Sequence, residues 1–410
     1  MAEKDKSKTD LLIGGGAYVG LSLAVAIKQA VPHMDITVVD AAPKDAWKKD
    51  PRASAIAAAA IRMLKQLDCW DDVEPLSEPI REMLITDSRT SDPVRPVFLT
   101  FSGDINPGEH FAYMVENKYL NGSLHKRAKA LGVNIIEAAA IKSFETEENS
   151  VCAQLSNGKS ITTKLLVGAD GSRSQLRDMA GIKKVYFPYN QMGIVCTVEH
   201  ERPHNGVAIE HFLPAGPFAI LPMKGNRSLL VWNENEAETK RLFAADDMIF
   251  EAEMTSRFGH FFGDLKVIGE KHAFPFGLTL ARDFVRPRFA LAGDAAHGIH
   301  PISGQGLNLG FRDVAALAEV IVETSRLGLD IGSLAALERY QSWRRFETVR
   351  MGITTDVLNR MFSNDITPLR VLRDFGLGLV DKLPKIKDYL ISEAAGVTKG
   401  SPKLLLGETL

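Results

Sequence analysis

The sequence predicts an α/β protein whose core is a discontinuous, Rossmann-like dinucleotide-binding domain. Three segments far apart in the chain predict it: GGGAYVG at residues 14–20, GADGSRS at 168–174 and GDAAHGIHPISGQGLNLGFRD at 293–313. Each follows a predicted strand and leads into a predicted helix, an arrangement that places ligands at the carboxyl edge of a parallel sheet. The β-rich stretches between the segments predict an inserted β-sheet domain.

Hydrophobic periodicity and turn residues predict the elements in chain order. A β-α-β unit is expected at the start, with strands at residues 10–13 and 35–40 around a helix at 18–30. The further expected elements are a helix at 54–67, β-structure over 80–115, a helix at 117–130, strands between 133 and 167, β-structure over 185–275 with a helix near 245–258, a strand at 288–292, a helix at 307–326, and helices after residue 332, two of them starting at Pro368 and Pro384.

These elements divide the chain into three predicted parts. Residues 1–75, 117–183 and 277–340 form the nucleotide-binding domain, and residues 76–116 and 184–276 form a β-sheet substrate domain. Residues 341–410 form a C-terminal helical region.

Composition excludes several classes of protein. The 410 residues carry 49 Lys and Arg against 51 Asp and Glu, without a basic stripe, which argues against nucleic-acid binding. The chain has three widely spaced cysteines, Cys69, Cys152 and Cys196. We therefore expect neither a disulfide framework nor a metal site, and we expect the protein to reside in a reducing compartment.

An uncharged stretch at residues 11–27 resembles a secretory signal. Acidic residues offset the lysines before it, and glycines interrupt it at turn spacing, so we interpret it as strand, turn and helix of a nucleotide site. No other stretch approaches the roughly 20 apolar residues of a membrane span. We therefore expect a cytoplasmic protein, at most attached to the inner face of a membrane.

The first glycine-rich turn has two possible registers. Gly14-x-Gly16-x-x-Val19 lacks the last glycine of the dinucleotide fingerprint, whereas Gly15-x-Ala17-x-x-Gly20 keeps the first and last. We prefer the second, because a glycine at position 20 lets the helix approach the strand. Asp40 ends the second strand at the spacing of a carboxylate that binds ribose.

The other two segments each carry a carboxylate at a strand end. Asp170 lies between glycines, where it can bind a ligand or cap the next helix, and the sequence leaves both open. Asp294 lies at the edge of the sheet, and the loop HPISGQG then leads into a helix that starts near Leu307 or Asn308. The positive end of this helix suits the negative charge of a reduced flavin. For His297 and His300 we expect a structural hydrogen-bonding role.

The sequence resembles the FAD-dependent aromatic hydroxylases with the p-hydroxybenzoate hydroxylase fold, and most closely their ubiquinone-biosynthesis branch, which acts on polyprenyl phenols. The resemblance covers essentially the whole chain. Beyond HPISGQGLNLGFRD, it rests on MVENKYL at 114–120, FLPAGPFAILP at 212–222 and LNRMFSNDITPLRVLRDFGLGLVDKLP at 358–384.

The resemblance implies a set of FAD-binding residues. Gly15, Gly20 and Asp40 would hold the ADP half, and Asp170 would lie beside the phosphates. Asp294 would bind the ribityl chain, and residues 301–308 would surround the isoalloxazine. The implied set is Gly15, Ala17, Gly20, Asp40, Arg52, Asn117, Asp170, Asp294, Pro301, Gly304, Gln305, Gly306, Leu307 and Asn308. Ala17 departs from the usual glycine, which would weaken FAD retention. From the residues alone, Arg52 would be interpreted as a solvated surface arginine, and Asn117 as the cap of the helix that follows it.

The resemblance also implies a reaction. NAD(P)H, as a transient reductant, and O2 would hydroxylate a phenol ring via a flavin C4a-hydroperoxide; no catalytic side chain is identified. Phe212, Phe218 and Leu221 are candidates for the apolar wall of the substrate pocket, or else sheet core. The alternatives are a hydroxylase of a small soluble aromatic and a non-catalytic FAD-binding scaffold of a quinone-synthesis complex. The C-terminal helices include Lys382, Lys385 and Lys387. We expect these helices either to contact a membrane or a partner, or to pack on the FAD-binding domain. The sequence leaves the oligomeric state open.

Overall fold

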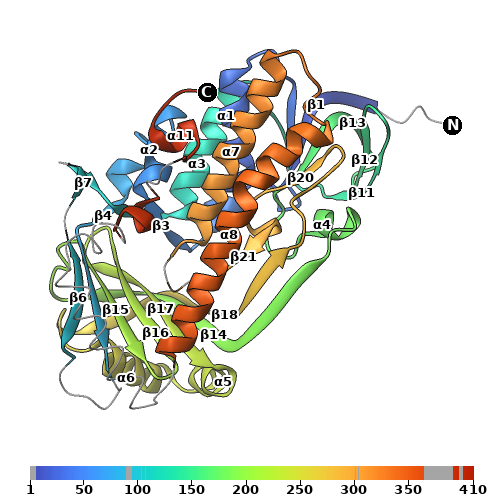
Figure 1. Ribbon diagram of the computed structural model, residues 1–410. Coiled ribbons are helices and arrows are strands. Elements are labelled where there is room, and N and C mark those ends of the chain that lie inside the picture. Colours follow the sequence, from blue (N-terminus) through green and yellow to red (C-terminus); the bar gives the residue numbers. More distant parts are fainter. Residues whose placement is uncertain are drawn as a thin grey trace.

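The computed structural model describes residues 6–88, 95–102, 104–106, 108–300, 302, 304–363, 391–396 and 400–410. Its architecture is α/β, with a Rossmann-like part and a second sheet that is inserted into it (Figure 1). Within the described residues, no helix combines the length and apolar character that crossing a bilayer requires.

The first sheet is built around three neighbouring parallel strands. β1 (Lys6–Gly14) lies between β13 (Ser160–Gly168) and β2 (Ile36–Val39), and its residues Leu11, Leu12 and Ile13 are fully buried. Continuous apolar runs of this kind suit a parallel sheet covered on both faces. The sheet is completed by β10 (Asn134–Ile136), β11 (Ile141–Thr146), β12 (Val151–Leu155), β19 (Val285–Arg286) and β20 (Phe289–Leu291).

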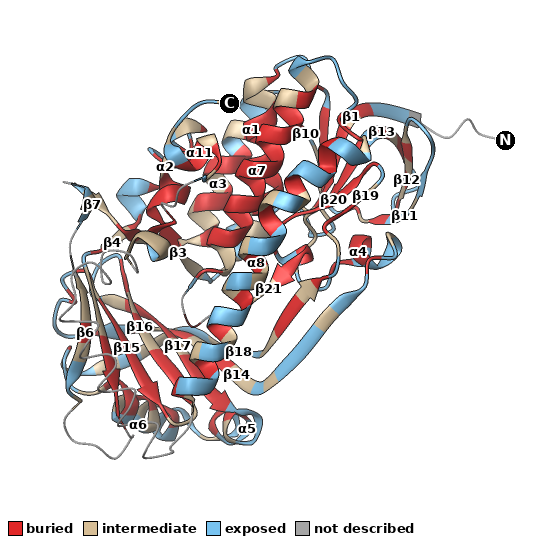
Figure 2. Cartoon of the chain, in the orientation of Figure 1, coloured by how far each residue is buried: buried red, intermediate tan, exposed pale blue. Residues whose placement is uncertain are grey.

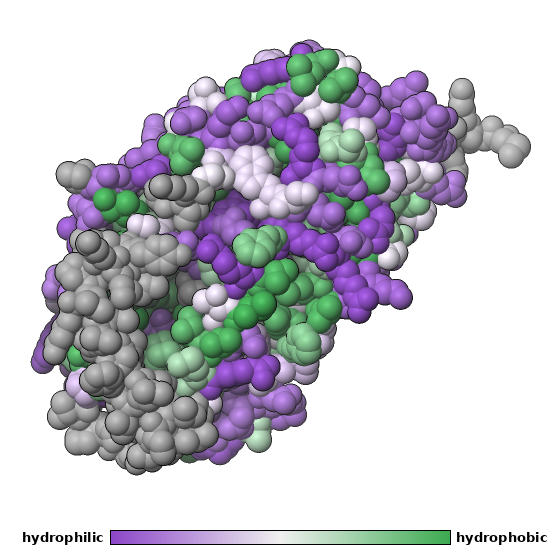
Figure 3. All heavy atoms as spheres, in the orientation of Figure 1, coloured by the Kyte–Doolittle hydropathy of each residue, from purple (hydrophilic) through white to green (hydrophobic). Residues whose placement is uncertain are grey.

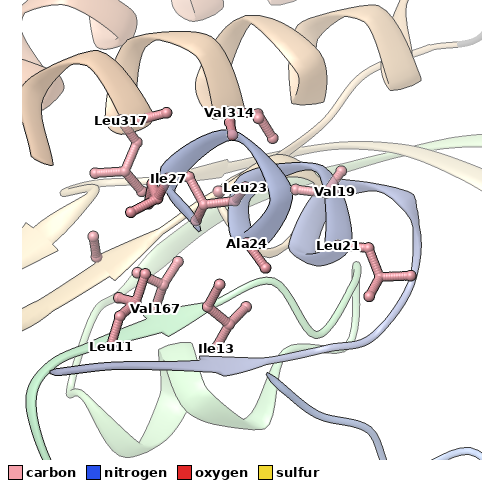
Figure 4. Close-up of a cluster of buried hydrophobic side chains, with 14 of the residues drawn as sticks. Leu11, Ile13, Val19, Leu21, Leu23, Ala24, Ile27, Val167, Val314 and Leu317 are labelled. Carbon is pink, nitrogen blue, oxygen red and sulfur yellow. The ribbon is translucent and has the colours of Figure 1, made fainter. Parts of the chain in front are cut away.

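Helices cover this sheet in layers. Side chains of α1 (Tyr18–Ala30) pack between the sheet and α7 (Gly306–Arg326), as Leu23 and Ile27 show in Figure 4. Both helices are buried along most of their length, whereas α8 (Leu334–Phe362) exposes one side (Figure 2). The described residues of this part also form the helices α2 (Ala58–Gln66), α3 (Asn117–Ala130), α4 (Gln175–Met179) and α11 (Lys403–Leu406), with short 3-10 turns η1 (Ala46–Lys49), η2 (Glu74–Leu76) and η3 (Gly293–Ala295).

The second sheet has eight strands in the order β21-β18-β14-β17-β16-β15-β5-β6. Two long strands, β14 (Lys184–His200) and β18 (Leu265–Ala281), form an antiparallel ribbon between the two parts of the molecule (Figure 1). The others are β5 (Glu82–Asp87), β6 (Val97–Ser102), β15 (Val207–Leu213), β16 (Gly216–Met223), β17 (Arg227–Asn235) and β21 (His297–Gly298). α5 (Glu236–Ala244) and α6 (Asp247–Phe258) accompany this sheet, and α6 packs on one face of it.

Two smaller sheets complete the fold. β9 (Ala112–Glu116) pairs with β3 (Ala53–Ala57) and β4 (Glu78–Ile80), and β7 (Asp104–Asn106) pairs with β8 (Glu109–His110). The helix predicted over 54–67 is therefore wrong at its start, because residues 53–57 pair with β9. The helix predicted near 245–258 is preceded by a second one, α5. The domain boundaries stay a prediction, and Pro368, Pro384 and the three C-terminal lysines lie outside the described residues.

Candidate cofactor and substrate site

The glycine-rich turn between β1 and α1 has the geometry of the register that begins at Gly15. Gly15 has φ +117°, and a Cβ there would lie 2.2 Å from the carbonyl oxygen of Ala169. At Gly20, a Cβ would lie 1.9 Å from the carbonyl oxygen of Gly15, so the helix approaches the turn as closely as backbone allows. Ala17 is exposed at the N-cap of α1, whose first N–H groups receive no side-chain cap. Such a helix start suits a pyrophosphate.

Asp40 lies beside this turn, directly after β2. One carboxylate oxygen accepts a hydrogen bond from the N–H of Gly16 at 3.1 Å, and the other from the N–H of Ala42 at 2.9 Å. A side chain at position 16 would also collide with Asp40, since a Cβ there would lie 2.7 Å from its oxygen. The carboxylate is thus fixed where a ribose can reach it; binding of ribose itself stays a prediction.

Arg52 and Asn117 come together through Asp50. The Arg52 guanidinium donates two hydrogen bonds of 2.8 Å to the Asp50 carboxylate, and about half of its side chain is exposed. Burial raises the pKa of Asp50, but its bonds with Arg52 outweigh this and hold it below the usual value. Asn117 is buried and accepts from the hydroxyl of Ser54 at 2.9 Å, while α3 has Glu116 as its N-cap. The Asn117 side chain does not act as the cap of α3.

Asp170 caps a helix. Its carboxylate accepts from the hydroxyl of Ser174 and from the N–H of Leu176, and Ser174 in turn caps α4 through the N–H of Arg177. These contacts match the capping interpretation, and ligand binding by Asp170 stays a prediction. Asp170 also follows Ala169, whose carbonyl abuts Gly15, so it remains next to the phosphate turn.

The third segment is organised by Asp313, a fully buried residue of α7. Its carboxylate accepts from the N–H of Gly293 at 2.9 Å, from Nε2 of His297 at 2.6 Å and from Nε of Arg344 at 2.8 Å. Burial raises the pKa of Asp313, but the charges of His297 and Arg344 outweigh it and keep the pKa low. The structural role expected for His297 is confirmed.

Asp294 lies in η3, and its side chain is exposed at the surface. Surrounding protein raises the pKa of its carboxyl, while the charges of His297 and Arg52 oppose the rise. The Tyr18 hydroxyl is close enough that Asp294 adds to the effect of burial, which raises the Tyr18 pKa to about 12. Arg52, Tyr18 and Asp294, from three distant segments, therefore share one electrostatic environment.

The start of α7 is held by Asn308. Its Oδ1 accepts from the N–H of Ala57 at 2.9 Å, and its Nδ2 donates to the carbonyls of Ala55 at 3.0 Å and Gly304 at 3.3 Å. Gln305 donates to the carbonyl of Ala394 at 3.1 Å and is the N-cap of α7, without a side-chain cap bond. Gly304 has φ +61°. Pro301 lies outside the described residues.

A cavity of about 540 Å³ lies between the start of α7, β3 and the inner face of the second sheet. Its described lining is mostly apolar and includes Phe212, Leu221 and Leu307. It also includes four other residues from the α7 start that the sequence singled out: Gly304, Gln305, Gly306 and Asn308. The site thus joins the α7 start to an apolar chamber.

Phe218 does not line this cavity, which corrects its assignment to the wall. Side chains alternate along β16, so that Pro217, Ala219 and Leu221 face the cavity. Phe218 points to the other face, where it is fully buried and its ring centroid lies 5.9 Å from that of Trp232. It belongs to the core beneath α6.

Three functional candidates escaped sequence reasoning: Asp313, Glu210 and Asn233. Glu210 and Asn233 line the cavity and are buried, with exposed fractions of 7% and 2%. For Glu210, the sequence offers one indication, because it is a carboxylate within the otherwise mostly apolar strand sequence VAIEHFL.

The residues present fit FAD. Two uncapped helix starts, a turn in which any side chain at position 15 or 20 would collide with backbone, and an apolar chamber at the second helix start are the features such a cofactor needs. Fold and site together define a dinucleotide-binding flavoprotein.

Comparison with known proteins specifies this class. Residues 8–345 match the FAD binding domain family. The chain is 41% identical to ubiquinone hydroxylase UbiL of Rhodospirillum rubrum, over 96% of this chain and 91% of that protein. It is 32% identical to 3-demethoxyubiquinol 3-hydroxylase of Escherichia coli, over 95% and 99%. The p-nitrophenol 4-monooxygenase PnpA of Pseudomonas putida has the same fold, with a TM-score of 0.79 at 17% identity, covering 95% of this chain and 98% of that one. The chain belongs to the FAD-dependent aromatic hydroxylases, in the branch that contains the ubiquinone-biosynthesis enzymes.

Proposed function

We propose that this protein hydroxylates the aromatic ring of a polyprenylated phenol in ubiquinone biosynthesis, using FAD, NAD(P)H and O2. The names of the two relatives support the substrate class. The observation that carries the proposal is the apolar cavity of about 540 Å³ that ends at the start of α7. An apolar chamber of this size suits a phenol ring with a hydrocarbon substituent.

The chain's own residues have distinct tasks in this proposal. The turn from Gly15 to Gly20 and the start of α1 bind the diphosphate, with Asp40 at the ribose and Asp170 beside the phosphates. Arg52 and Asn117 border the middle of the cofactor, and Asp294 binds its ribityl hydroxyls. Residues 304–308 hold the ring, with the α7 N–H groups at its electron-rich edge.

When bound, FAD supplies the activation of O2 with reducing equivalents from NAD(P)H. The protein excludes water through the apolar lining of the cavity and orients the phenol ring against the start of α7. Phe212 and Leu221 provide part of that lining.

We further propose that the protein works at the cytoplasmic face of a membrane, where prenylated phenols reside, alone or within a quinone-synthesis complex. Apolar side chains gather over α8 and the ribbon of β14 and β18 (Figure 3), among them the exposed Phe187, Phe274, Ile353 and Val357. Exposed apolar patches mark membrane or protein contacts. Co-sedimentation with anionic lipid vesicles tests this; a protein that stays in the supernatant contradicts membrane contact.

Deletion of the gene in its host tests the proposed function. We expect ubiquinone to fall and a prenylated precursor lacking one hydroxyl to accumulate, as identified by mass spectrometry. Plasmid-borne wild-type protein should restore ubiquinone, whereas Gly15→Val, which blocks the phosphate turn, should not. Unchanged ubiquinone in the deletion strain contradicts the proposal, and restoration by Gly15→Val would indicate a scaffold.

A further inference from the structure

Glu210 occupies the middle of the cavity floor. The strand register places it opposite Ile85 on β5 and Ala219 on β16, and the same row continues to Leu99 on β6 and Val231 on β17. All five side chains line the cavity. A carboxylate therefore interrupts a row of apolar side chains on the inner face of the sheet.

Among the described residues of the cavity lining, Glu210 is the one ionisable side chain. It is more than nine-tenths buried, and it has no hydrogen bond or ion pair within the described part of the chain. On β5, Asp87 lies two residues after Ile85, on the same face of the sheet and opposite Phe212. His211, the next residue after Glu210, points to the opposite face, where its Nδ1 shares a hydrogen bond with the hydroxyl of Thr86. β16 and β17 bring no titratable side chain to the described lining.

A buried carboxyl without a hydrogen-bond partner lowers the stability of the folded protein. Such a residue is typical of a site where the carboxyl interacts with a ligand. Neighbouring polar groups do not explain it, because Asn233, the other buried polar residue nearby, also leaves both side-chain atoms without a partner in the described structure. The two residues lie on different strands and rows, so each can bind a different part of a ligand.

We propose that Glu210 accepts the hydrogen bond of the substrate's phenolic hydroxyl and takes its proton during hydroxylation. This inference rests on the proposed function. The O–H bond of the phenol breaks, a new O–H bond forms on the Glu210 carboxylate, and the electron pair stays on the phenolate oxygen. The ring carbon ortho to that oxygen becomes more electron-rich, which is where the new hydroxyl enters.

Burial also matches Glu210 to this task. It raises the pKa of the carboxyl to about 8, nearer to the value of about 10 for a phenol such as tyrosine. A base close in pKa to the group that it deprotonates is more effective than a solvated carboxylate.

The test uses the FAD-loaded, full-length protein with a farnesylated phenol as substrate. In Glu210→Gln we expect hydroxylation to fall about 100-fold, mainly in kcat, as for loss of a general base. The rise of the wild-type rate with pH near pH 8 should disappear in this variant, and Glu210→Asp should restore the pH dependence at a reduced rate. Asn233→Leu, which also removes a polar group from the cavity, should keep the pH dependence.

The possible results distinguish a failure of the Glu210 proposal from a failure of the proposed function. Retention of the wild-type rate and pH profile in Glu210→Gln overturns the inference while leaving the proposed function intact. If wild-type protein does not hydroxylate the phenol, the proposed function fails, and the role of Glu210 with it. A structural role for Glu210 would appear as a lower Tm and lost FAD in Glu210→Gln, whereas we expect an equal or higher Tm.

Discussion

Nε2 of His297 donates to Oδ2 of Asp313 over 2.6 Å, and both side chains are fully buried. The same oxygen accepts from the N–H of Gly293, and Oδ1 accepts from Arg344 on α8. One carboxylate therefore joins the loop that carries Asp294 to α7 and α8. The position of that loop relative to the start of α7 depends on this contact.

Asp313→Asn should destabilise the protein strongly. It removes one of the two carboxylates, Asp313 and Glu347, that pair with the buried Arg344, and breaking a buried ion pair costs about 3–5 kcal/mol. Urea unfolding followed by circular dichroism measures this, with Glu236→Gln, which removes an exposed ion pair with Lys240, as the control that should leave stability unchanged. An equally stable Asp313→Asn would show that the network does not hold the loop.

Gly20→Ala should weaken FAD binding about 10- to 100-fold. The added methyl would meet the carbonyl of Gly15, and overpacking of this kind costs about 1–3 kcal/mol. Titration of the apoprotein by FAD fluorescence measures the effect. Gly298→Ala is the matched control, because its methyl would make only an ordinary contact with Thr279 at 3.7 Å; equal affinities for the two variants would contradict the assignment of the turn.

Ala17→Gly should bind FAD several-fold more tightly than the wild type. Ala17 is exposed at the N-cap of α1, where a methyl group limits how closely a diphosphate approaches the backbone, and glycine is the better N-cap residue. The same fluorescence titration compares the two proteins. Unchanged or weaker binding would mean that the diphosphate does not pass over residue 17.

The pH dependence of stability should report Glu210. Because burial raises its folded-state pKa to about 8, the folded protein holds a proton that the unfolded chain has lost above about pH 4.5, so the penalty for this residue grows with pH up to about 8. Relative to substrate-free wild type, Glu210→Gln should therefore gain stability between pH 5 and 8, approaching a tenfold change in the folding equilibrium constant per pH unit. Parallel Tm curves for both proteins would contradict a buried, unpaired carboxyl.

Local signals were sufficient for some elements and not for others. The helix predicted at 117–130 is α3. This prediction succeeded because the spacing of apolar residues within the segment is enough to indicate a helix. Residues 53–57 are alanine-rich and favour a helix in isolation, yet Asn308, some 250 residues away, binds their backbone as strand β3. A propensity cannot anticipate such a contact.

The same limit applies to the site. The glycines of the phosphate turn are visible in the sequence, because their spacing follows from backbone geometry. Phe218 and Leu221 belong to an apolar strand buried on both faces, so composition does not say which face lines the cavity. Glu210 becomes meaningful only once the register places it among Ile85, Ala219 and Val231.

The central claim is that this FAD-binding protein inserts an oxygen atom from O2 into a prenylated phenol. The most direct test supplies purified, FAD-loaded protein with a farnesylated phenol, NADH or NADPH, and O2 enriched in the heavy oxygen isotope, and analyses the product by mass spectrometry. We predict a hydroxylated phenol that carries the heavy isotope in its new hydroxyl. Oxidation of the nicotinamide without any hydroxylated product, or a new hydroxyl derived from water, would contradict the account.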